Sequence, residues 1–417
     1  MRKISVALVM ACLLAACPSD EPAKTGLTPS GRGTASSTAT DVASPPPTSS
    51  TASPTDAPSP PPDEPGPDGG PVPPGFRPID STFLSPDEGW FLGDAPCDEP
   101  PCTSIVRTQD GGETWEGIPA PVAIIADPGG EYACGSAEDG SPLSGPCVSK
   151  IRFADELNGY VFEPSMYETH DGGATWTPSP GSWTPPTQSE GAQVSYLEAS
   201  GGTAVRIATR CPGTEGDPCF ARVERASVDG GPWETLEVRP GRTEFETPSL
   251  TLSRRGEAIW LRHVDYGAYE SRHWVSADGG TTWRGTDGHC VGNYEWLEPL
   301  DENHAWLYCG SDADDPSTAD STEDGGVTWH EAGELPDGPG AGVFAALTTE
   351  NAVYVSRGAV YLTDDGARTW RASATIAVPD VTPIIGFVDA RHGRVLDEET
   401  VWFTEDGGDT WREERFE

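Results

Sequence analysis

The sequence predicts an all-β fold, a seven-bladed β-propeller with a signal peptide and a disordered stalk before it. Three observations support this prediction. A turn pattern, Ser/Thr-x-Asp-x-Gly-x-Thr-Trp, occurs seven times in full or in part. Glycine (49) and proline (42) are abundant among the 417 residues, as is typical of turn-rich β proteins. The chain after the signal peptide carries no long helical stripe of apolar residues.

Residues 1–16 are predicted to be a targeting segment that is removed from the mature protein. Arg2 and Lys3 form a basic start, and the apolar run 4–14 is too short to span a bilayer. The run closes with Leu-Ala-Ala-Cys, which resembles a bacterial lipobox ending at Cys17. The resemblance implies a lipidated Cys17 and contact with the membrane through this anchor only. An ordinary signal peptide with a chance cysteine is the alternative.

Residues 17–75 are predicted to be a disordered linker that carries the lipid anchor. The segment is rich in Pro, Ser and Thr and has almost no large apolar side chains, so burial cannot offset its conformational entropy. Such a composition favours an extended, semi-rigid stalk. We therefore expect an exported protein at the outer face of the bacterial cytoplasmic membrane, with its propeller in residues 76–417.

The seven repeated turns each contain one aspartate, which we interpret as structural. Its carboxylate is expected to accept N–H groups inside a β-hairpin turn, and the glycines allow positive φ without steric cost. An active site occurs once, whereas these residues recur in every repeat. The third repeat lacks the Thr before its Trp and is the least regular. The aspartates are Asp110, Asp171, Asp229, Asp278, Asp324, Asp365 and Asp406.

Each repeat is expected to form one blade of four antiparallel strands. Upstream of the turns, segments such as 83–91 (FLSPDEGWF) and 153–160 (FADELNGY) predict a strand, a polar turn and a second strand. With the turns, this pattern resembles the Asp-box or BNR repeats of sialidases, sortilin-type receptors, some glycoside hydrolases and, most of all, photosystem II assembly factors. The resemblance covers residues 76–417 and implies the fold rather than a function.

The blades shorten along the chain, which indicates insertions in the early ones. Successive repeat aspartates are 61, 58, 49, 46, 41 and 41 residues apart. The extra residues fall in connections on the face opposite the repeated turns, and such insertions often mark a binding face, with neutral loop variation as the alternative. The insertions are 94–103, 119–147, 177–192, 210–220, 263–273 and 310–319.

Eight cysteines follow Cys12 and Cys17, an even number in a chain that is expected to be exported. They occur as neighbours in sequence, and the blade arrangement favours local disulfides on the insertion-bearing face. A metal site is the alternative, but no Cys-x-x-Cys or histidine spacing supports one. The expected pairs are Cys97–Cys102, Cys134–Cys147, Cys211–Cys219 and Cys290–Cys309.

The net charge of −41 argues against nucleic-acid binding, because such a surface repels phosphate backbones. We expect a monomer without a cofactor. The acidic residues Asp312, Asp314 and Asp315 are interpreted as a solvated loop, for which a structural Ca²⁺ site is the alternative.

The preferred function is a binding module for an envelope protein, peptide or glycan, with no catalytic residue assigned. The candidate ligand contacts are Arg77, Trp183, Tyr266 and Tyr269. A purely structural envelope protein is a further alternative.

The main alternative is an extracellular glycoside hydrolase of the sialidase type, which needs three arginines and a set of catalytic residues. Arg77 lies in Phe-Arg-Pro-Ile, whereas the sialidase motif is Phe/Tyr-Arg-Ile-Pro. Arg206, Arg262 and Arg272 are candidates for the other two arginines but carry no recognisable motif.

Overall fold

The computed structural model consists of strands joined by turns, without a helix in the residues that it describes. Accordingly, these residues include no helix long and apolar enough to cross a membrane. The described residues are 67, 69–97, 102–125, 145–179, 193–210, 219–239, 244–246, 250–265, 270–290, 294–310, 317–336, 342–376, 384–397 and 400–416.

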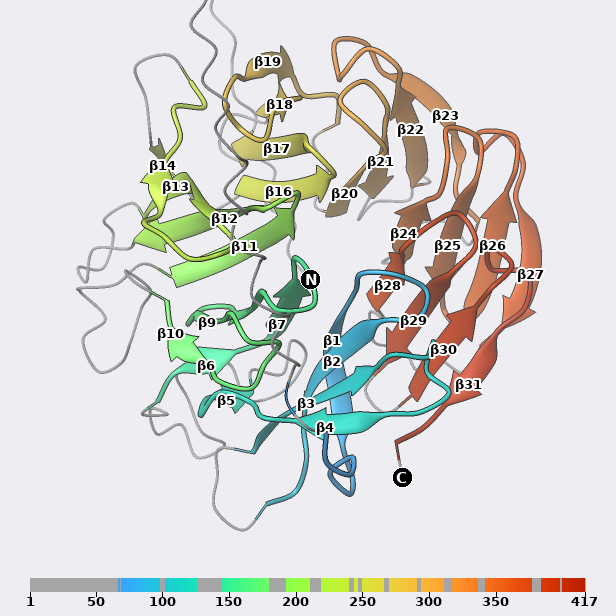
Figure 1. Cartoon of the computed structure of the whole chain (residues 1–417). Helices are drawn as coiled ribbons and strands as arrows, with labels where there is room; N and C mark the ends of the chain where they lie inside the picture. Colours follow the sequence, from blue (N-terminus) through green and yellow to red (C-terminus); the bar gives the residue numbers. More distant parts are fainter. Residues whose placement is uncertain are drawn as a thin grey trace, which may run out of the picture. The chain divides into compact units, whose positions relative to one another are not determined.

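Successive groups of four strands form antiparallel sheets, and seven such sheets surround a central axis (Figure 1). The fold is therefore a seven-bladed β-propeller, as the repeats predict. The first four blades comprise β1 (Arg77–Phe83), β2 (Gly89–Asp94), β3 (Thr103–Thr108) and β4 (Glu116–Ile118); β7 (Lys150–Phe153), β8 (Gly159–Phe162), β9 (Tyr167–Thr169) and β10 (Thr177–Pro178); β11 (Gln193–Ser200), β12 (Thr203–Arg210), β13 (Phe220–Ser227) and β14 (Glu234–Thr235); β16 (Leu250–Arg255), β17 (Ala258–Asp265), β18 (Glu270–Ser276) and β19 (Arg284–Asp287).

The last three blades have the same order from the axis outward. They comprise β20 (Tyr294–Pro299), β21 (Ala305–Gly310), β22 (Thr318–Thr322) and β23 (His330–Glu334); β24 (Val343–Ala346), β25 (Ala352–Ser356), β26 (Ala359–Thr363) and β27 (Arg371–Thr375); β28 (Ile384–Phe387), β29 (Gly393–Asp397), β30 (Thr400–Thr404) and β31 (Arg412–Glu414). Two short additions are β15 (Phe245–Glu246), which pairs with β13, and the parallel pair β5 (Ile124–Ile125) and β6 (Cys147–Val148).

The ring closes by packing of blade 7 on blade 1. Both sheets contain four consecutive strands, so neither borrows a strand from the other. Arg394 on β29 donates from Nε to the hydroxyl of Ser81 on β1 at 2.7 Å. Phe76 and Phe416 pack edge to face with ring centroids 5.2 Å apart. The sequence alone did not distinguish this closure from a swapped strand.

The chain is already ordered shortly before β1, within the range expected to be linker. Gly70 and Gly117 exchange two backbone hydrogen bonds of 2.8 and 2.9 Å, which places residue 70 beside β4. The chain therefore contacts the outer strand of blade 1 before it enters the inner strand.

The repeated turn joins the third and fourth strands of each blade and is built by its own side chains. In blade 2, Thr169 donates from its hydroxyl to Asp171 at 2.8 Å, while Thr175 donates from its amide (2.8 Å) and its hydroxyl (2.6 Å). The same bonds occur in six blades. Within the described part of the chain, the side chain of Asp229 in blade 3 makes no hydrogen bond, in line with the shorter repeat.

Backbone hydrogen bonds place the repeated turn beside the turn between the first and second strands of the same blade. In blade 2 the amide of Gly172 donates to the carbonyl of Leu157 at 2.9 Å, and in blade 5 the amide of Gly325 donates to Asn303 at 2.8 Å. Both kinds of turn therefore lie on one face of the ring, and the longer connections lie on the other.

Replacement of Asp171 by Ala is expected to destabilise the propeller by about 1–3 kcal/mol, because it removes three hydrogen bonds to a charged acceptor. Asp229→Ala is the matched control and is expected to change the unfolding free energy by less than about 0.5 kcal/mol. Denaturant midpoints of the two variants check this. Equal losses would show that the carboxylate bonds do not stabilise the turn.

Large aromatic side chains pack between the blades. Trp90 on β2 is fully buried and stacks on Phe153 of blade 2, with ring centroids 4.0 Å apart. Trp306 on β21 donates from Nε1 to the carbonyl of Thr348, a turn residue of blade 6, at 2.9 Å. These side chains hold neighbouring sheets in a defined register and make the ring a rigid support for its turns and loops.

Candidate functional site

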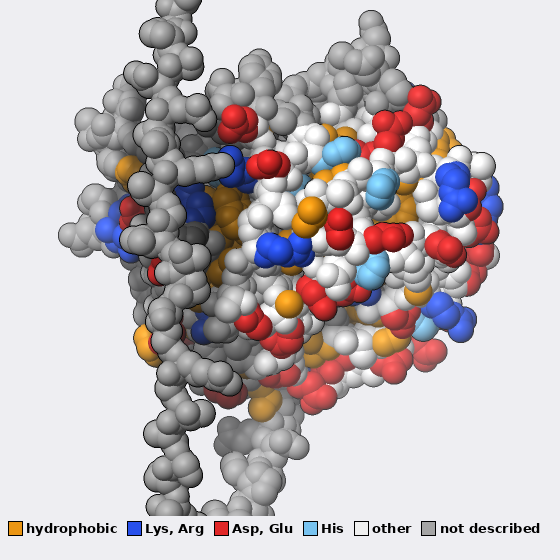
Figure 2. Space-filling model, turned by 90° about the horizontal axis from the view of Figure 1, so that it is seen from above, with side chains coloured by type: hydrophobic (Ala, Val, Ile, Leu, Met, Phe, Trp, Pro, Cys, Tyr) orange, Lys and Arg blue, Asp and Glu red, His pale blue; other side chains and the backbone are white. Residues whose placement is uncertain are grey.

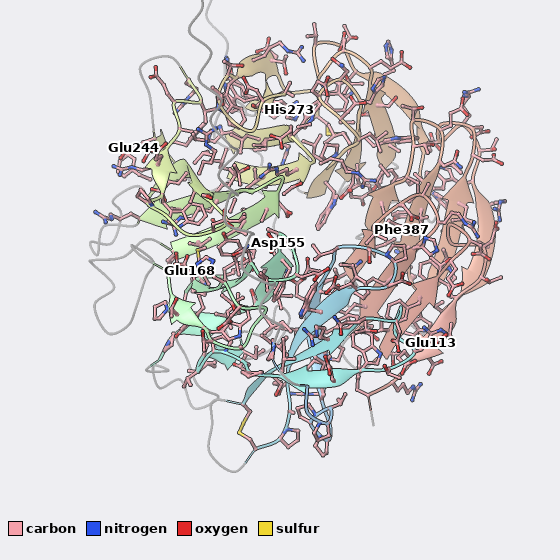
Figure 3. The ribbon with its side chains drawn as sticks, viewed as in Figure 1. Glu113, Asp155, Glu168, Glu244, His273 and Phe387 are labelled. Atoms are coloured by element: carbon pink, nitrogen blue, oxygen red, sulfur yellow. A yellow bond between two sulfur atoms is a disulfide. The ribbon has the colours of Figure 1, made fainter. Side chains whose placement is uncertain are left out.

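The junction of blades 1 and 7 contains a cleft of about 660 Å³. It opens on the face that carries the repeated turns. Phe83 and Phe403 lie among its lining residues, beside the turns that contain Asp110 and Glu405. Figure 3 shows Glu113 at this junction, with His273 on the far side of the ring.

The cleft is lined by four carboxylates and two guanidinium groups. Glu113, Glu405 and Asp87 are exposed. The fourth carboxylate, Asp110, belongs to a repeated turn, where the hydroxyl and amide of Thr114 hold its pKa below the usual range. The rim of the cleft therefore carries negative charge at neutral pH.

Both arginines of the cleft are held by protein groups. The guanidinium of Arg394 lies 4.3 Å from the ring centroid of Phe83 and binds Ser81. Arg412 lies 5.2 Å from the ring of Phe403 and donates to Glu414 at 2.8 Å. The two guanidinium groups thus already interact with protein groups, whereas the exposed carboxylates of the cleft are available to a ligand.

A second group of charges lies on the inner strands around the axis. Arg152 on β7 bridges Asp80 on β1 (Nη1 to Oδ2, 3.0 Å) and Glu198 on β11 (Nε to Oε1, 3.3 Å). The carboxylate of Asp80 is only 3% exposed and also accepts the amide of Ile151 at 2.8 Å. Lys150 lies 3.8 Å from Asp80. These bonds tie together the inner strands of blades 1, 2 and 3.

Glu298 on β20 is a carboxyl group on the inner strands whose acidity is strongly reduced. Desolvation by the surrounding protein raises its pKa to about 7, although the indole N–H of Trp296 and the charge of Arg255 oppose this shift. The Trp296 side chain donates to Oε1 of Glu298 and remains half exposed. The group is therefore able to hold a proton near neutral pH.

The interior between blades 4 and 5 contains a neutral histidine. His273 on β18 is fully buried, and within the described residues neither of its ring nitrogens has a hydrogen-bond partner. Desolvation lowers its pKa to about 3, and the nearby charges of Arg262 and His289 act in the same direction. Its ring centroid lies 5.4 Å from that of Trp329.

The structure contains the disulfides Cys97–Cys102 and Cys290–Cys309. Cys147 and Cys219 are also disulfide-bonded. The other predicted partners, Cys134 and Cys211, lie outside the described residues, as does Cys17.

Most of the predicted ligand contacts lie outside the part of the chain that the structure describes. This applies to Trp183, Tyr266 and Tyr269, and also to the acidic run 312–315. Arg77 is described; it begins β1 and forms an ion pair with Asp94 at 2.7 Å. No group of three or more His, Cys, Asp or Glu side chains among the described residues is arranged to hold a metal ion.

The arginines considered for a sialidase site are bound in separate places. Arg206 is 3% exposed, pairs with Glu224 at 2.8 Å and lies over the ring of Trp233. Arg262 lies on β17, the second strand of blade 4, and is buried opposite His273 of β18. Arg272 on β18 is largely exposed and reaches Asp287 at 4.0 Å. The structure thus gives no common carboxylate-binding group formed by these residues and Arg77.

The cleft residues were missed in the sequence because they come from opposite ends of the propeller. Phe83 and Arg394 are separated by more than three hundred residues. The only available signal was the repeat count, since a closed ring must place the first blade beside the last. The charged inner-strand residues had a different signal, namely charged side chains within the predicted first strands, such as Asp80 in Arg77–Phe83 and Glu298 in Tyr294–Pro299.

No protein-family model matches the chain, and no curated protein matches it. The solved structure of YCF48 from Cyanidioschyzon merolae is similar, at 16% identity and a TM-score of 0.50, over 82% of this chain and 99% of that one. A structure described as YCF48 bound to D1 peptide has 19% identity and a TM-score of 0.51 over the same shares. A puromycin-hydrolyzing peptidase from Mycobacterium tuberculosis has 12% identity and a TM-score of 0.50, over 82% of this chain but 53% of that one. At these identities the similarity shows the propeller fold.

Proposed function

We propose that this protein is an exported binding module, anchored by lipid at Cys17, that recognises a polypeptide segment of an envelope protein in the cleft between blades 1 and 7. The observation that carries the proposal is the cleft itself. Its volume of about 660 Å³ lies within the range of small-ligand sites and leaves room for a short peptide segment. The ordered turns on both sides make it a preformed site.

The charges around the cleft favour a segment that contains Lys or Arg. Four carboxylates face two guanidinium groups, and both guanidinium groups already contact protein partners. The aromatic rings of Phe83 and Phe403 offer apolar area for an adjacent side chain. The net charge of −41 would also speed the approach of a basic segment at low salt.

The similarity to a YCF48 structure with a bound D1 peptide supports a peptide as the ligand class. It does so as an analogy between propellers, because a fold alone does not determine a ligand. In this proposal the linker of residues 17–75 holds a monomeric propeller away from the outer face of the cytoplasmic membrane. The disulfide-closed loops on the other face then remain open to further contacts.

The proposal is tested with the full chain on an array of 15-residue peptides from extracytoplasmic segments of envelope proteins. We expect bound peptides to be rich in Lys and Arg, and we expect the double variant Glu113→Lys/Glu405→Lys to weaken their binding about tenfold or more, because both side chains are exposed on the cleft. Affinities would be measured by fluorescence anisotropy.

Glu302→Lys is the matched control, since Glu302 is an exposed turn residue on the same face in blade 5. It should leave binding within about twofold at moderate salt, where distant exposed charges are screened. Equal losses in the control and in the cleft variant would assign the effect to overall charge. Binding that is unchanged in all variants would remove the cleft as the site.

A glycoside hydrolase is the second candidate, and the raised pKa of Glu298 is the observation that favours it. A general acid needs a carboxyl group that stays protonated near neutral pH. The discriminating assay offers a fluorogenic sialoside and a polysaccharide panel to the full chain. Turnover that disappears in Glu298→Gln would favour the hydrolase, whereas no turnover on any substrate would leave the binding module.

A further inference from the structure

The Cys290–Cys309 disulfide lies at the junction of blades 4 and 5, beside two titratable side chains. It joins the crossover after β19 to the second strand of blade 5, and both cysteines are half-buried. The carbonyl of Cys290 accepts the hydroxyl of Ser271 on β18 at 3.0 Å. The disulfide therefore links the crossover to both blades.

A buried carboxyl group contacts one sulfur of this disulfide. Asp320 on β22 is 3% exposed, and its Oδ2 lies 3.2 Å from Sγ of Cys309. A disulfide sulfur carries no proton that it can donate, so an ionised carboxylate gains no hydrogen bond from this contact. Burial of such a group is costly without compensation, and desolvation accordingly raises the pKa of Asp320. The contact becomes favourable once the disulfide is reduced and one proton is shared, as a thiol facing the carboxylate or a thiolate facing the neutral carboxyl group.

His289 connects the buried carboxyl group with solvent. Its Nε2 lies 3.0 Å from the same Oδ2 of Asp320, and its side chain is 34% exposed. The imidazole stacks on the indole of Trp329, with ring centroids 5.9 Å apart and an interplanar angle of 17°. The imidazole is thus held with Nε2 beside the buried Asp320 while part of the ring contacts solvent.

We propose that Cys290–Cys309 is a thiol–disulfide exchange site, in which Asp320 supplies and removes the proton of Cys309 and His289 connects Asp320 with solvent. The co-reactant is a dithiol. One thiolate of the dithiol attacks Sγ of Cys290, the S–S bond breaks, and its electron pair goes to Sγ of Cys309. The neutral carboxyl group of Asp320 protonates that sulfur and regains a proton through His289.

The second thiol of the dithiol completes the exchange. It loses its proton to solvent, attacks the mixed disulfide as a thiolate, releases Cys290 as a thiolate that takes a proton from water, and leaves the co-reactant as a disulfide. Two electrons pass from the dithiol to Cys290 and Cys309, and the two protons that the dithiol releases to solvent balance the two that these cysteines take up. In the reverse direction the carboxylate of Asp320 accepts the thiol proton of Cys309, which makes that sulfur a nucleophile.

The other charged groups around this site come from three elements. Glu331 on β23 lies opposite Asp320 in the sheet and opposes its ionisation. His289 on the crossover favours ionisation of Asp320. On the blade 4 side, the charge of His289 also acts on His273 of β18. Asp320 is thus the buried acid of the group and His289 is its exposed neighbour.

The second described disulfide provides an internal control. Cys97–Cys102 closes a short loop between β2 and β3, with a sequence separation of 5. The oxidised full chain would be treated with dithiothreitol over a range of pH and quenched by alkylation, and each cysteine would be quantified by mass spectrometry. The ionisation of dithiothreitol changes both reduction rates by the same factor at each pH. The ratio of the two rates therefore reports only the difference between the two disulfides.

Asp320→Asn is expected to slow reduction of Cys290–Cys309 about tenfold or more, since it removes the proton donor, and to leave Cys97–Cys102 unchanged. In the wild type the rate ratio should fall as pH rises and Asp320 ionises, whereas it should be flat in Asp320→Asn. His289→Gln, at a half-exposed position, should slow the same disulfide several-fold. A rate ratio that is unchanged in both variants, with an unchanged pH profile, would overturn the proposal, as would faster reduction of Cys290–Cys309 in both.

Discussion

Acidification from pH 7 to 4.5 is expected to lower the unfolding free energy of the wild-type propeller by about 2.5 kcal/mol through His273, and His273→Phe is expected to lack this loss. The imidazole is fully buried, and its pKa in the folded state is about 3. In the unfolded chain a histidine has a pKa of about 6.5. Below that value the unfolded state binds a proton that the folded state excludes.

The sign follows from this difference in proton binding. Because the folded pKa is lowered, the unfolded state is favoured increasingly as the pH falls from 6.5 toward 3, and the effect levels off below the folded pKa. The carboxylates of the repeated turns act in a lower range. The backbone amide of Thr328 helps to lower the pKa of Asp324 to about 2, so its contribution is present above pH 4 and is lost as the pH falls toward 2. Glu298, whose pKa is raised to about 7, instead binds a proton in the folded state between pH 7 and 4.5, which stabilises the wild type and His273→Phe alike and cancels in their comparison.

The measurement is the urea midpoint of each variant at half-unit steps between pH 7 and 4.5. His273→Phe keeps an aromatic ring against Trp329 but cannot bind a proton. The control is His330→Gln, because His330 is exposed on β23. Parallel pH curves for the wild type and His273→Phe would mean that His273 does not titrate differently in the folded state.

Arg152→Met is expected to destabilise the propeller by about 3–5 kcal/mol at pH 7, the range for removing one partner from a buried ion pair. The substitution removes the guanidinium that lies 3.0 Å from the buried carboxylate of Asp80, and it removes the ion pair with Glu198 as well. The loss falls on the inner strands of three blades at once. Partial exposure of Arg152 itself places the expected value toward the lower end of this range.

Lys150→Met is the matched control on the same strand, since Lys150 reaches Asp80 only at 3.8 Å. We expect it to cost less than about 1 kcal/mol. The double variant Asp80→Asn/Arg152→Met removes the unpaired charge and should recover part of the loss. If the double variant is destabilised by the full sum of the single losses, the two side chains are not coupled, and the ion pair does not explain the effect of Arg152→Met.

Acidic side chains are spread over the face shown in Figure 2, where basic ones are isolated. This pattern is consistent with the net charge of −41. It also explains why charge alone did not locate a site. The sites described above depend on particular neighbours, such as the guanidinium of Arg394 over Phe83 or the imidazole of His289 beside Asp320.

The sequence by itself determined the blade count and the chemistry of the turns, because both depend on local interactions that recur. The bonds around Asp171 join residues within four positions of one another. The weak third repeat was also visible in the sequence, and the structure shows Asp229 without those bonds. Local pairing of Cys97 with Cys102 belongs to the same class.

Only the tertiary structure decided which side chains meet between blades. Closure of the ring places blade 7 beside blade 1 and forms the cleft. Packing between blades also brings Asp320 to Cys309 and His289, and it buries His273 in a neutral form. Sequence periodicity tells which strands form a blade, but the contacts between blades depend on side-chain packing across residues that no local pattern relates. The binding and exchange sites proposed for this protein lie at such junctions.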